Sequence, residues 1–126
     1  MEVLLFDSRN DQVEMIEEIL TRIDCKVSSV MEENQCFAEL IRGKYDLILF
    51  DHGIPGLDVI DFVTQIETID RCISVAMMVS LPSRFYEDKY GCTGIDFLLF
   101  KPFGYNEISW LVKEALQYSL KLRKAS

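Results

Sequence analysis

Four short runs of this chain are almost entirely apolar, and longer segments with helical periodicity separate them. The runs lie within residues 2–7, 45–51, 73–80 and 95–101 and include VLLF, LILF, ISVAMMV and IDFLLF. Continuous apolar runs of this length are typical of strands that are covered on both faces, as in a parallel sheet, whereas half-exposed strands alternate. A fifth run at 26–31, KVSSVM, is more polar. We therefore expect five parallel strands, with this last run at an edge.

Between these runs, apolar residues repeat with the spacing of one face of a helix. The periodicity predicts helices over residues 13–23, 33–43, 59–66, 83–91 and 106–124. The fourth segment is short and charged and has the weakest pattern, whereas Asp58 is a candidate N-cap for the third helix. Strands and helices thus alternate along the chain, which indicates an α/β fold. Right-handed βαβ connections then lead to a doubly wound, five-stranded parallel sheet.

The composition is that of a folded, acidic domain. A chain of 126 residues has the size of one domain, and we expect residues 1–126 to form a single one. Hydrophobic residues make up 49% and charged residues 27%, as in ordinary globular proteins. The net charge of -8 argues against a nucleic-acid-binding surface, which needs clustered lysine and arginine. A membrane-spanning run and a signal-peptide pattern are both missing, so we expect a cytoplasmic protein without membrane contact.

The cysteines and the single histidine do not form a metal-binding or redox pattern. The four cysteines are Cys25, Cys36, Cys72 and Cys92. They are scattered, without a C-x-x-C pair, so reduced and mostly packed thiols are expected. His52 follows Asp51 directly, which suggests an acid–base role, but a histidine in a loop is more often solvated.

Polar residues end four of the five predicted strands. They are Asp7 with Ser8 after the first strand, Asp51 after the third, Ser80 after the fourth and Lys101 after the fifth. The carboxyl ends of parallel strands lie at one edge of a sheet, where α/β proteins bind ligands. Carboxylate oxygens are ligands that Mg²⁺ prefers, and a carboxylate can also attack phosphorus to form an acyl phosphate. A lysine and a hydroxyl could hold the oxygens of the transferred group.

The same strand ends carry a resemblance to a known family. The segments V-L-L-F-D-S, D-L-I-L-F-D-H-G-I-P-G-L-D and F-L-L-F-K-P-F, with the hydroxyl of Ser80 between the last two, resemble bacterial response-regulator receiver domains of two-component signalling. The similarity extends from Val3 to about Leu122 and keeps the order and spacing of the motifs. It implies a flavodoxin-like (βα)5 fold with strand order 2-1-3-4-5.

The resemblance also implies roles for the residues at the strand ends. Asp51 would be the phosphoacceptor, taking a phosphoryl group from the phosphohistidine of a histidine kinase or phosphotransfer protein. Asp7, Asp51 and the backbone carbonyl of Gly53 would bind Mg²⁺. Lys101 would pair first with Asp51 and then with the phosphoryl oxygens, and Ser80 would turn inward to hydrogen-bond the phosphoryl group. The bond between Lys101 and Pro102 would be cis.

The movement of Ser80 would signal to a surface formed by residues 83–91, 95–101 and 106–124. There the resemblance implies contact with a downstream effector protein or domain, or with a second copy of the chain. Trp110 falls opposite the apolar stripe of the last helix, among charged residues. An exposed tryptophan of this kind is either an interface anchor or a solitary surface residue.

Four residues depart from the family pattern, and one of them is Val59, which stands where a glycine is common. Receivers usually carry two adjacent acids after the first strand, and the second is here Ser8, so any metal contact of Ser8 would be weak or water-mediated. Ser8 with Asp11 also resembles a capping pair at the start of a helix. Leu81 stands where a small residue is usual, and Leu98 where a switch aromatic is usual. Two interpretations stay open: a phosphoryl-accepting switch, and a degenerate receiver that acts as a phosphorylation-independent interaction module.

Enzyme interpretations fit less well. A flavodoxin-like FMN protein needs a glycine- and hydroxyl-rich phosphate loop after the first strand, where this chain has S-R-N-D-Q. A phosphatase with an aspartate nucleophile would have a second aspartate at Gly53. The dinucleotide fingerprint G-x-G-x-x-G does not follow the first strand. We therefore expect a signalling domain rather than an enzyme.

Overall fold

The computed structural model describes residues 1–80, 90 and 94–125, with side chains up to residue 118. Its elements are, in order, β1 (Glu2–Phe6), α1 (Asn10–Arg22), β2 (Lys26–Val30), α2 (Glu33–Arg42), β3 (Leu47–Asp51), α3 (Val59–Ile69), β4 (Ser74–Val79), β5 (Phe97–Phe100) and α5 (Tyr105–Ala125). The helix predicted at 83–91 lies, apart from Tyr90, outside the described residues. No helix in the described ranges is long and apolar enough to cross a membrane.

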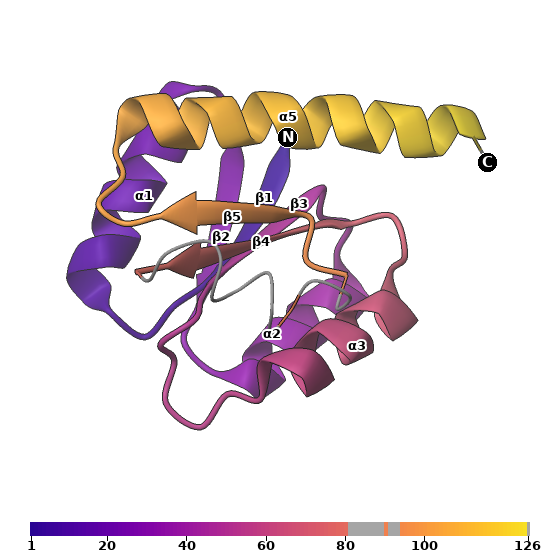
Figure 1. Cartoon of the computed structure of the whole chain (residues 1–126), viewed down its shortest axis with the longest axis horizontal. Coiled ribbons are helices and arrows are strands. Elements are labelled where there is room, and N and C mark those ends of the chain that lie inside the picture. The colour runs from indigo at the N-terminus through magenta and orange to yellow at the C-terminus, as the bar shows by residue number, and fades with distance from the viewer. Residues whose placement is uncertain (81–89, 91–93, 126) are drawn as a thin grey trace.

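The five strands form one parallel sheet in the order β2-β1-β3-β4-β5. Helices α1 and α5 cover one face and α2 and α3 the other (Figure 1). The predicted fold class and strand order are confirmed. The predicted strands are one or two residues too long at some ends, because pairing with a neighbour, rather than composition, decides where a strand stops. The polar strand β2 lies at an edge, as predicted.

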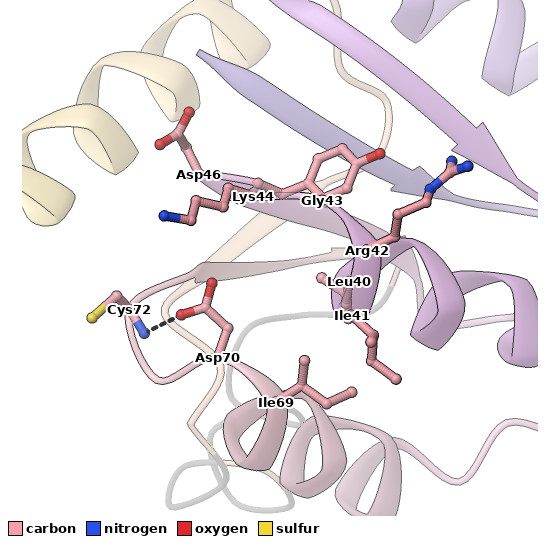
Figure 2. A pocket seen from close by; sticks show the side chains of 10 residues that line it. Leu40, Ile41, Arg42, Gly43, Lys44, Asp46, Ile69, Asp70 and Cys72 are labelled. Carbon is pink, nitrogen blue, oxygen red and sulfur yellow. Dashed lines mark hydrogen bonds between the residues drawn. The ribbon is translucent and has the colours of Figure 1, made fainter.

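The amino ends of the central strands border a surface cavity of about 470 Å³ (Figure 2). Residues 40–46 line it together with Ile69, Asp70 and Cys72. The lining mixes basic and acidic side chains with apolar ones, and the Cys72 backbone N–H donates to Asp70 Oδ1 at 2.8 Å. This cavity lies at the opposite end of the sheet from the predicted site residues, which all follow the carboxyl ends of strands.

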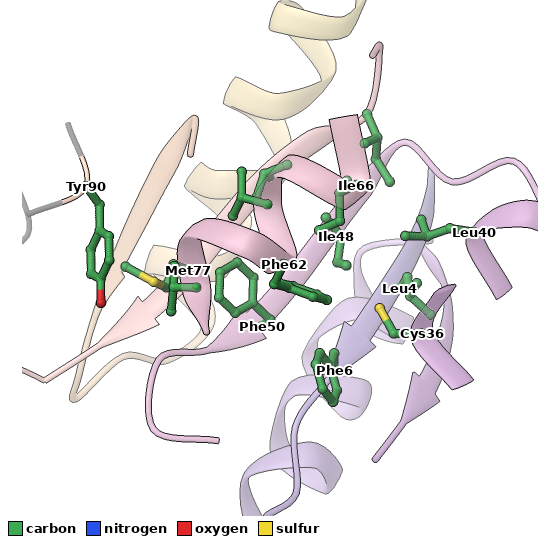
Figure 3. Packing of buried hydrophobic residues seen from close by; sticks show 14 of the residues in the cluster. Leu4, Phe6, Cys36, Leu40, Ile48, Phe50, Phe62, Ile66, Met77 and Tyr90 are labelled. Carbon is green, nitrogen blue, oxygen red and sulfur yellow. The ribbon is translucent and has the colours of Figure 1, made fainter. Parts of the chain in front are cut away.

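Two apolar clusters fill the space between the sheet and its helices. On the α2/α3 side, Phe62 is fully buried, and its ring centroid lies 5.4 Å from that of Phe6 and 5.0 Å from that of Phe50 (Figure 3). Successive side chains of a strand point to opposite faces. Met77 therefore packs on the α2/α3 side and Met78 on the α1/α5 side, both fully buried. The apolar runs of the sequence are thus strands covered on both faces.

Of the two predicted helix caps, Asp58 is confirmed and Ser8 is not. Asp58 is the N-cap of α3, and its Oδ1 accepts a hydrogen bond from the Asp61 backbone N–H at 3.1 Å, as predicted. The capping role predicted for Ser8 is wrong, because α1 begins at Asn10 and its N-cap is Arg9, whose side chain makes no capping hydrogen bond. The carboxylate of Asp7 forms the local turn instead, accepting from the Arg9 backbone N–H at 3.1 Å.

Candidate functional site

The register of the sheet places Asp7 and Asp51 next to each other. Phe6 of β1 pairs with Phe50 of β3, so the residues that follow them stand side by side at the carboxyl edge. Both phenylalanines point to the α2/α3 side. Side-chain alternation therefore turns Asp7 and Asp51 toward α1. Both carboxylates are buried, with 1% and 4% of the residue exposed, and buried charges need partners.

Asp51 has a partner on each carboxylate oxygen. The Lys101 ammonium lies 2.5 Å from Oδ1, and the Gly53 backbone N–H donates to Oδ2 at 2.8 Å. A Cβ atom at position 53 would lie 3.0 Å from Oδ2, so glycine suits this close approach. The ion pair holds the carboxylate in one orientation at the edge of the sheet, and charge-assisted hydrogen bonds of this kind are among the stronger ones in proteins.

Ser80 and Lys101 lie at the same carboxyl edge of the sheet, after the next two strands, β4 and β5. Val79 of β4 pairs with Phe100 of β5, so Ser80 and Lys101 follow in register. Ser80 is exposed, and β4 lies between the strands of Asp51 and Lys101. The Lys101–Pro102 peptide bond is cis, as expected. The structure thus brings the predicted carboxylates, hydroxyl and ammonium to one edge.

Gln12 is a site residue that no pattern in the sequence indicated. From the first turn of α1, its side-chain amide nitrogen donates to Asp7 Oδ2 and, at 3.3 Å, to Asp51 Oδ1. The only signal in the sequence is its position just before Val13, where the apolar face of α1 begins. A polar residue in the first turn of a helix is too common to identify a site.

The family of this chain is shown by a sequence match that includes residues of all five strands. The sequence profile described as "Response regulator receiver domain" matches residues 3–113. The chain belongs to this family. Among solved structures, NtrX from Brucella abortus has a TM-score of 0.89 at 17% identity, over 98% of this chain and 28% of that one. CheY4 of Vibrio cholerae has a TM-score of 0.82 at 17% identity, over 90% of this chain and 97% of that one.

A curated relative of this receiver is "Hybrid signal transduction histidine kinase L" of Dictyostelium discoideum. The two are 25% identical over 120 residues, which is 89% of this chain and 7% of the relative. The chain therefore spans a small part of the relative that it matches.

The acidic pocket of this receiver has a donor set that suits a magnesium ion with few protein ligands. Two buried carboxylates and the exposed backbone of Gly53 offer oxygen atoms, and Mg²⁺ commonly uses one or two carboxylates together with water and phosphate oxygens. Across the described residues, His, Cys, Asp and Glu side chains do not gather in groups of three or more that could hold a metal ion. Ser8 is exposed beside the pocket and adds no charge. The residues present fit Mg²⁺, with one charged ligand fewer than two adjacent acids would give.

Two further predicted positions of the receiver have described surroundings, Leu98 and His52. Leu98 is partly buried and packs on the α2/α3 side of β5, while Leu81 lies outside the described residues. The expectation of a solvated His52 is wrong, because the residue is half-buried and its Nε2 lies 3.3 Å from the hydroxyl of the buried Tyr90. His52 thus connects the loop after Asp51 to a core residue that lies between β4 and β5 in the sequence.

The thiols that the structure describes are free, and two are packed. Burial raises the pKa of the Cys36 thiol to about 12 and also raises the pKa of Cys25. The expectation of mostly packed thiols holds for Cys25 and Cys36, whereas Cys72 is exposed and Cys92 lies outside the described residues. A thiolate is the reactive form of cysteine, so Cys36 is poorly suited to chemistry near neutral pH.

An aromatic cluster covers the β5/α5 edge of the receiver. Trp110 is 50% exposed, and its ring centroid lies 6.4 Å from that of Phe97 in an edge-to-face arrangement. Tyr118 meets the same Phe97 ring at 6.1 Å. We call Phe97, Trp110 and Tyr118 the aromatic edge. Trp110 is therefore one member of a partly exposed cluster rather than a solitary surface residue.

Proposed function

We propose that this receiver domain accepts a phosphoryl group on Asp51 from the phosphohistidine of a histidine kinase or phosphotransfer protein in the cytoplasm. The observation that carries the proposal is the orientation of the Asp51 carboxylate by Lys101 on Oδ1 and by the Gly53 N–H on Oδ2. A nucleophile held at the edge of a sheet with a cation beside it suits phosphoryl transfer, which depends mainly on positioning and charge stabilisation. The name of the curated relative, a hybrid histidine kinase, supports this class of donor.

In the proposed step, an Asp51 oxygen attacks phosphorus and the O–P bond forms as the P–N bond of the donor breaks. The electron pair of that bond stays on the imidazole nitrogen, which takes up a proton from water. Lys101 moves from the carboxylate to the phosphoryl oxygens, whose charge it balances. Ser80, which follows β4 between the strands of the other two residues, donates its hydroxyl to the same group. Mg²⁺, when held by Asp7, Asp51 and the Gly53 carbonyl, supplies further charge neutralisation.

The test is the intact mass of the protein after incubation with Mg²⁺ and a small phosphodonor. We expect a gain of one phosphoryl group in the parent protein and none in Asp51→Asn. Asp11→Asn is the matched control, because Asp11 is an exposed acid at the same end of the molecule. A mass gain that survives in Asp51→Asn would contradict the assignment of the phosphoacceptor.

A second candidate function is a phosphorylation-independent interaction module. The observation in its favour is the neutral Ser8, which leaves the pocket only Asp7 and Asp51 as charged ligands among the described residues. In that case, partner binding or self-association would be the same in the parent protein and in Asp51→Asn, with and without phosphodonor.

The proposed docking surface for an effector or a second copy is the aromatic edge. Trp110 provides an anchor, and Lys113 and Glu114 provide polar surroundings on the same helix. The side chain of Lys121, further along the same helix, lies outside the described side chains. Because β5 and Lys101 are continuous in the chain, a movement at the phosphoryl site has a short path to this surface.

A further inference from the structure

Gln12 reaches both carboxylates of the acidic pocket with one atom. Its Nε2 donates to Asp7 Oδ2 and to Asp51 Oδ1, the latter at 3.3 Å. A primary amide carries two N–H groups, so one nitrogen can serve two acceptors at once. Both acceptors are buried carboxylates, and hydrogen bonds to ionised acceptors are stronger than those between neutral groups.

The amide nitrogen of Gln12 thus lies between the two side chains that would share a cation. An ion bound by Asp7 and Asp51 together needs to contact one oxygen of each carboxylate. The Gln12 amide contacts one oxygen of each already. The two arrangements compete for the same oxygens and the same space between them.

We propose that the Gln12 side chain is a built-in competitor for the divalent cation of this pocket. The inference rests on the proposed function, because it concerns the same carboxylates, and it adds the residue that sets the cation concentration at which they become available. The amide is neutral, so it donates a hydrogen bond to Asp7 without balancing the charge of the carboxylate. A divalent cation does balance that charge, and it displaces the amide when its concentration is high enough.

The side chain can leave without disturbing the fold. Gln12 is half-buried in the first turn of α1, and the buried contacts of this helix are made further along by Ile16 and Leu20. Rotation about the side-chain bonds of Gln12 therefore frees the pocket while α1 stays packed. Lys101 approaches the same Asp51 Oδ1 from the β5 side, so the proposed exchange concerns the amide that lies beside this ion pair.

The test uses Mn²⁺, an oxygen-binding divalent cation whose free concentration is read directly by electron paramagnetic resonance, with phosphodonor omitted. Gln12→Met keeps the length and helix propensity of the side chain and removes both donors. We expect this variant to bind Mn²⁺ about tenfold more tightly than the parent, as for the loss of one competing charge-assisted hydrogen bond. Gln12→Ala should show the same direction of change.

Gln65→Met is the matched control. The amide of Gln65 also donates to an aspartate, Asp61 Oδ2 at 2.6 Å, but on the exposed side of α3. Its Mn²⁺ affinity should equal that of the parent protein. Equal or weaker Mn²⁺ binding in both Gln12 variants would overturn the proposal, as would undetectable binding in all the proteins. Urea unfolding shows that each variant is folded.

A second readout follows Gln12 itself. Its side-chain NH₂ signals in a ¹⁵N–¹H spectrum are identified by their loss in Gln12→Met. Titration of the parent protein with Mg²⁺ should move them toward the position of a solvated amide, and signals that stay in place while the cation binds would overturn the proposal. These experiments are separate from the phosphoryl mass shift. Tighter cation binding without phosphorylation would contradict the proposed function and leave the competitor role intact.

Discussion

Lys101 of the β5 end contacts Asp51 of the β3 end at 2.5 Å, although β4 lies between their strands. The lysine side chain therefore reaches across the end of β4, where Ser80 stands. Its ammonium balances one of the two buried carboxylates, and Asp7 has the neutral Gln12 amide instead. The pocket keeps a net negative charge that is smaller than it would be with a second acid at position 8.

Ser8→Asp should strengthen Mg²⁺ binding. A second adjacent acid adds a full charge beside the pocket, and charge-pair energies of ~1–4 kcal/mol at contact distance correspond to an affinity gain on the order of tenfold or more. We expect binding weaker than millimolar in the parent protein, together with slow phosphorylation that the substitution speeds up. Calorimetric titration with Mg²⁺ measures the change. Ser8→Asn, similar in shape but neutral, should bind like the parent. Equal affinities in all three proteins would show that Ser8 does not limit Mg²⁺ binding, and Leu81 would then be the next residue to test.

Phe62→Ala should destabilise the fold severely. The ring is fully buried and contacts the rings of Phe6, Phe37 and Phe50, so its removal leaves a cavity in the α2/α3 cluster. We expect a loss of about 3–5 kcal/mol in the free energy of unfolding. Ile60→Ala, on the same helix and 51% exposed, should change it by less than about 0.5 kcal/mol. Urea denaturation of both variants measures the free energy of unfolding. A loss in Phe62→Ala as small as that in Ile60→Ala would mean that the cluster closes around the cavity.

Asp96→Asn should change how stability depends on pH. The pKa of Asp96 lies above its ordinary 3.8, mainly because the carboxyl group is buried. Hydrogen bonds from the Val75 N–H and with Tyr118 lower this pKa, and the charge of Glu67 raises it. Because the native state holds this proton more tightly, the contribution of Asp96 to stability is complete below pH 3.8 and is lost as pH rises through the folded pKa. Asparagine removes the charge and retains an oxygen for the Val75 N–H.

The free energies of unfolding of Asp96→Asn and of the parent should therefore diverge as pH rises from 3.8, in favour of the variant. Urea unfolding at a series of pH values measures the difference. Glu67→Gln is the second variant, and it should shift the loss to lower pH because one of the causes of the raised pKa is gone. A difference that stays constant over this range would rule out a titrating Asp96.

Trp110→Ala should weaken association through the aromatic edge. A half-exposed tryptophan packed against Phe97 has the character of a binding hot spot, and truncation of such anchors commonly costs ~2 kcal/mol or more, about thirtyfold in affinity. Sedimentation equilibrium with and without phosphodonor, and pull-down with a candidate kinase or effector, measure the change. Ile60→Ala is the control, equally exposed but on the α2/α3 side of the sheet. Unchanged association in Trp110→Ala would show that another surface is used.

Much of this receiver could be predicted from local patterns. Central strands that are buried on both faces must be apolar throughout, so β3 and β4 are visible as continuous runs. A strand also ends where a polar side chain reaches the edge of the sheet, which identifies Asp7, Asp51 and Lys101 without any coordinates. The parallel arrangement then brings these ends together, because alternating helices return the chain to the same side each time.

Which groups contact one another at that edge depends on how the helices and strands pack in three dimensions. In the sequence, Gln12 is an ordinary first-turn residue. The register of β1 and β3 places both carboxylates within hydrogen-bonding distance of its side chain. In the sequence, His52 has the pattern of a solvated loop residue. In the structure it lies beside Tyr90, which is far along the chain. The capping pattern at Ser8 is wrong because α1 begins at Asn10 with Arg9 as its N-cap, while Asp7 accepts the Arg9 N–H in the turn before it. Such contacts depend on distances between segments remote in sequence, whereas hydrophobic periodicity reports only on neighbours along the chain.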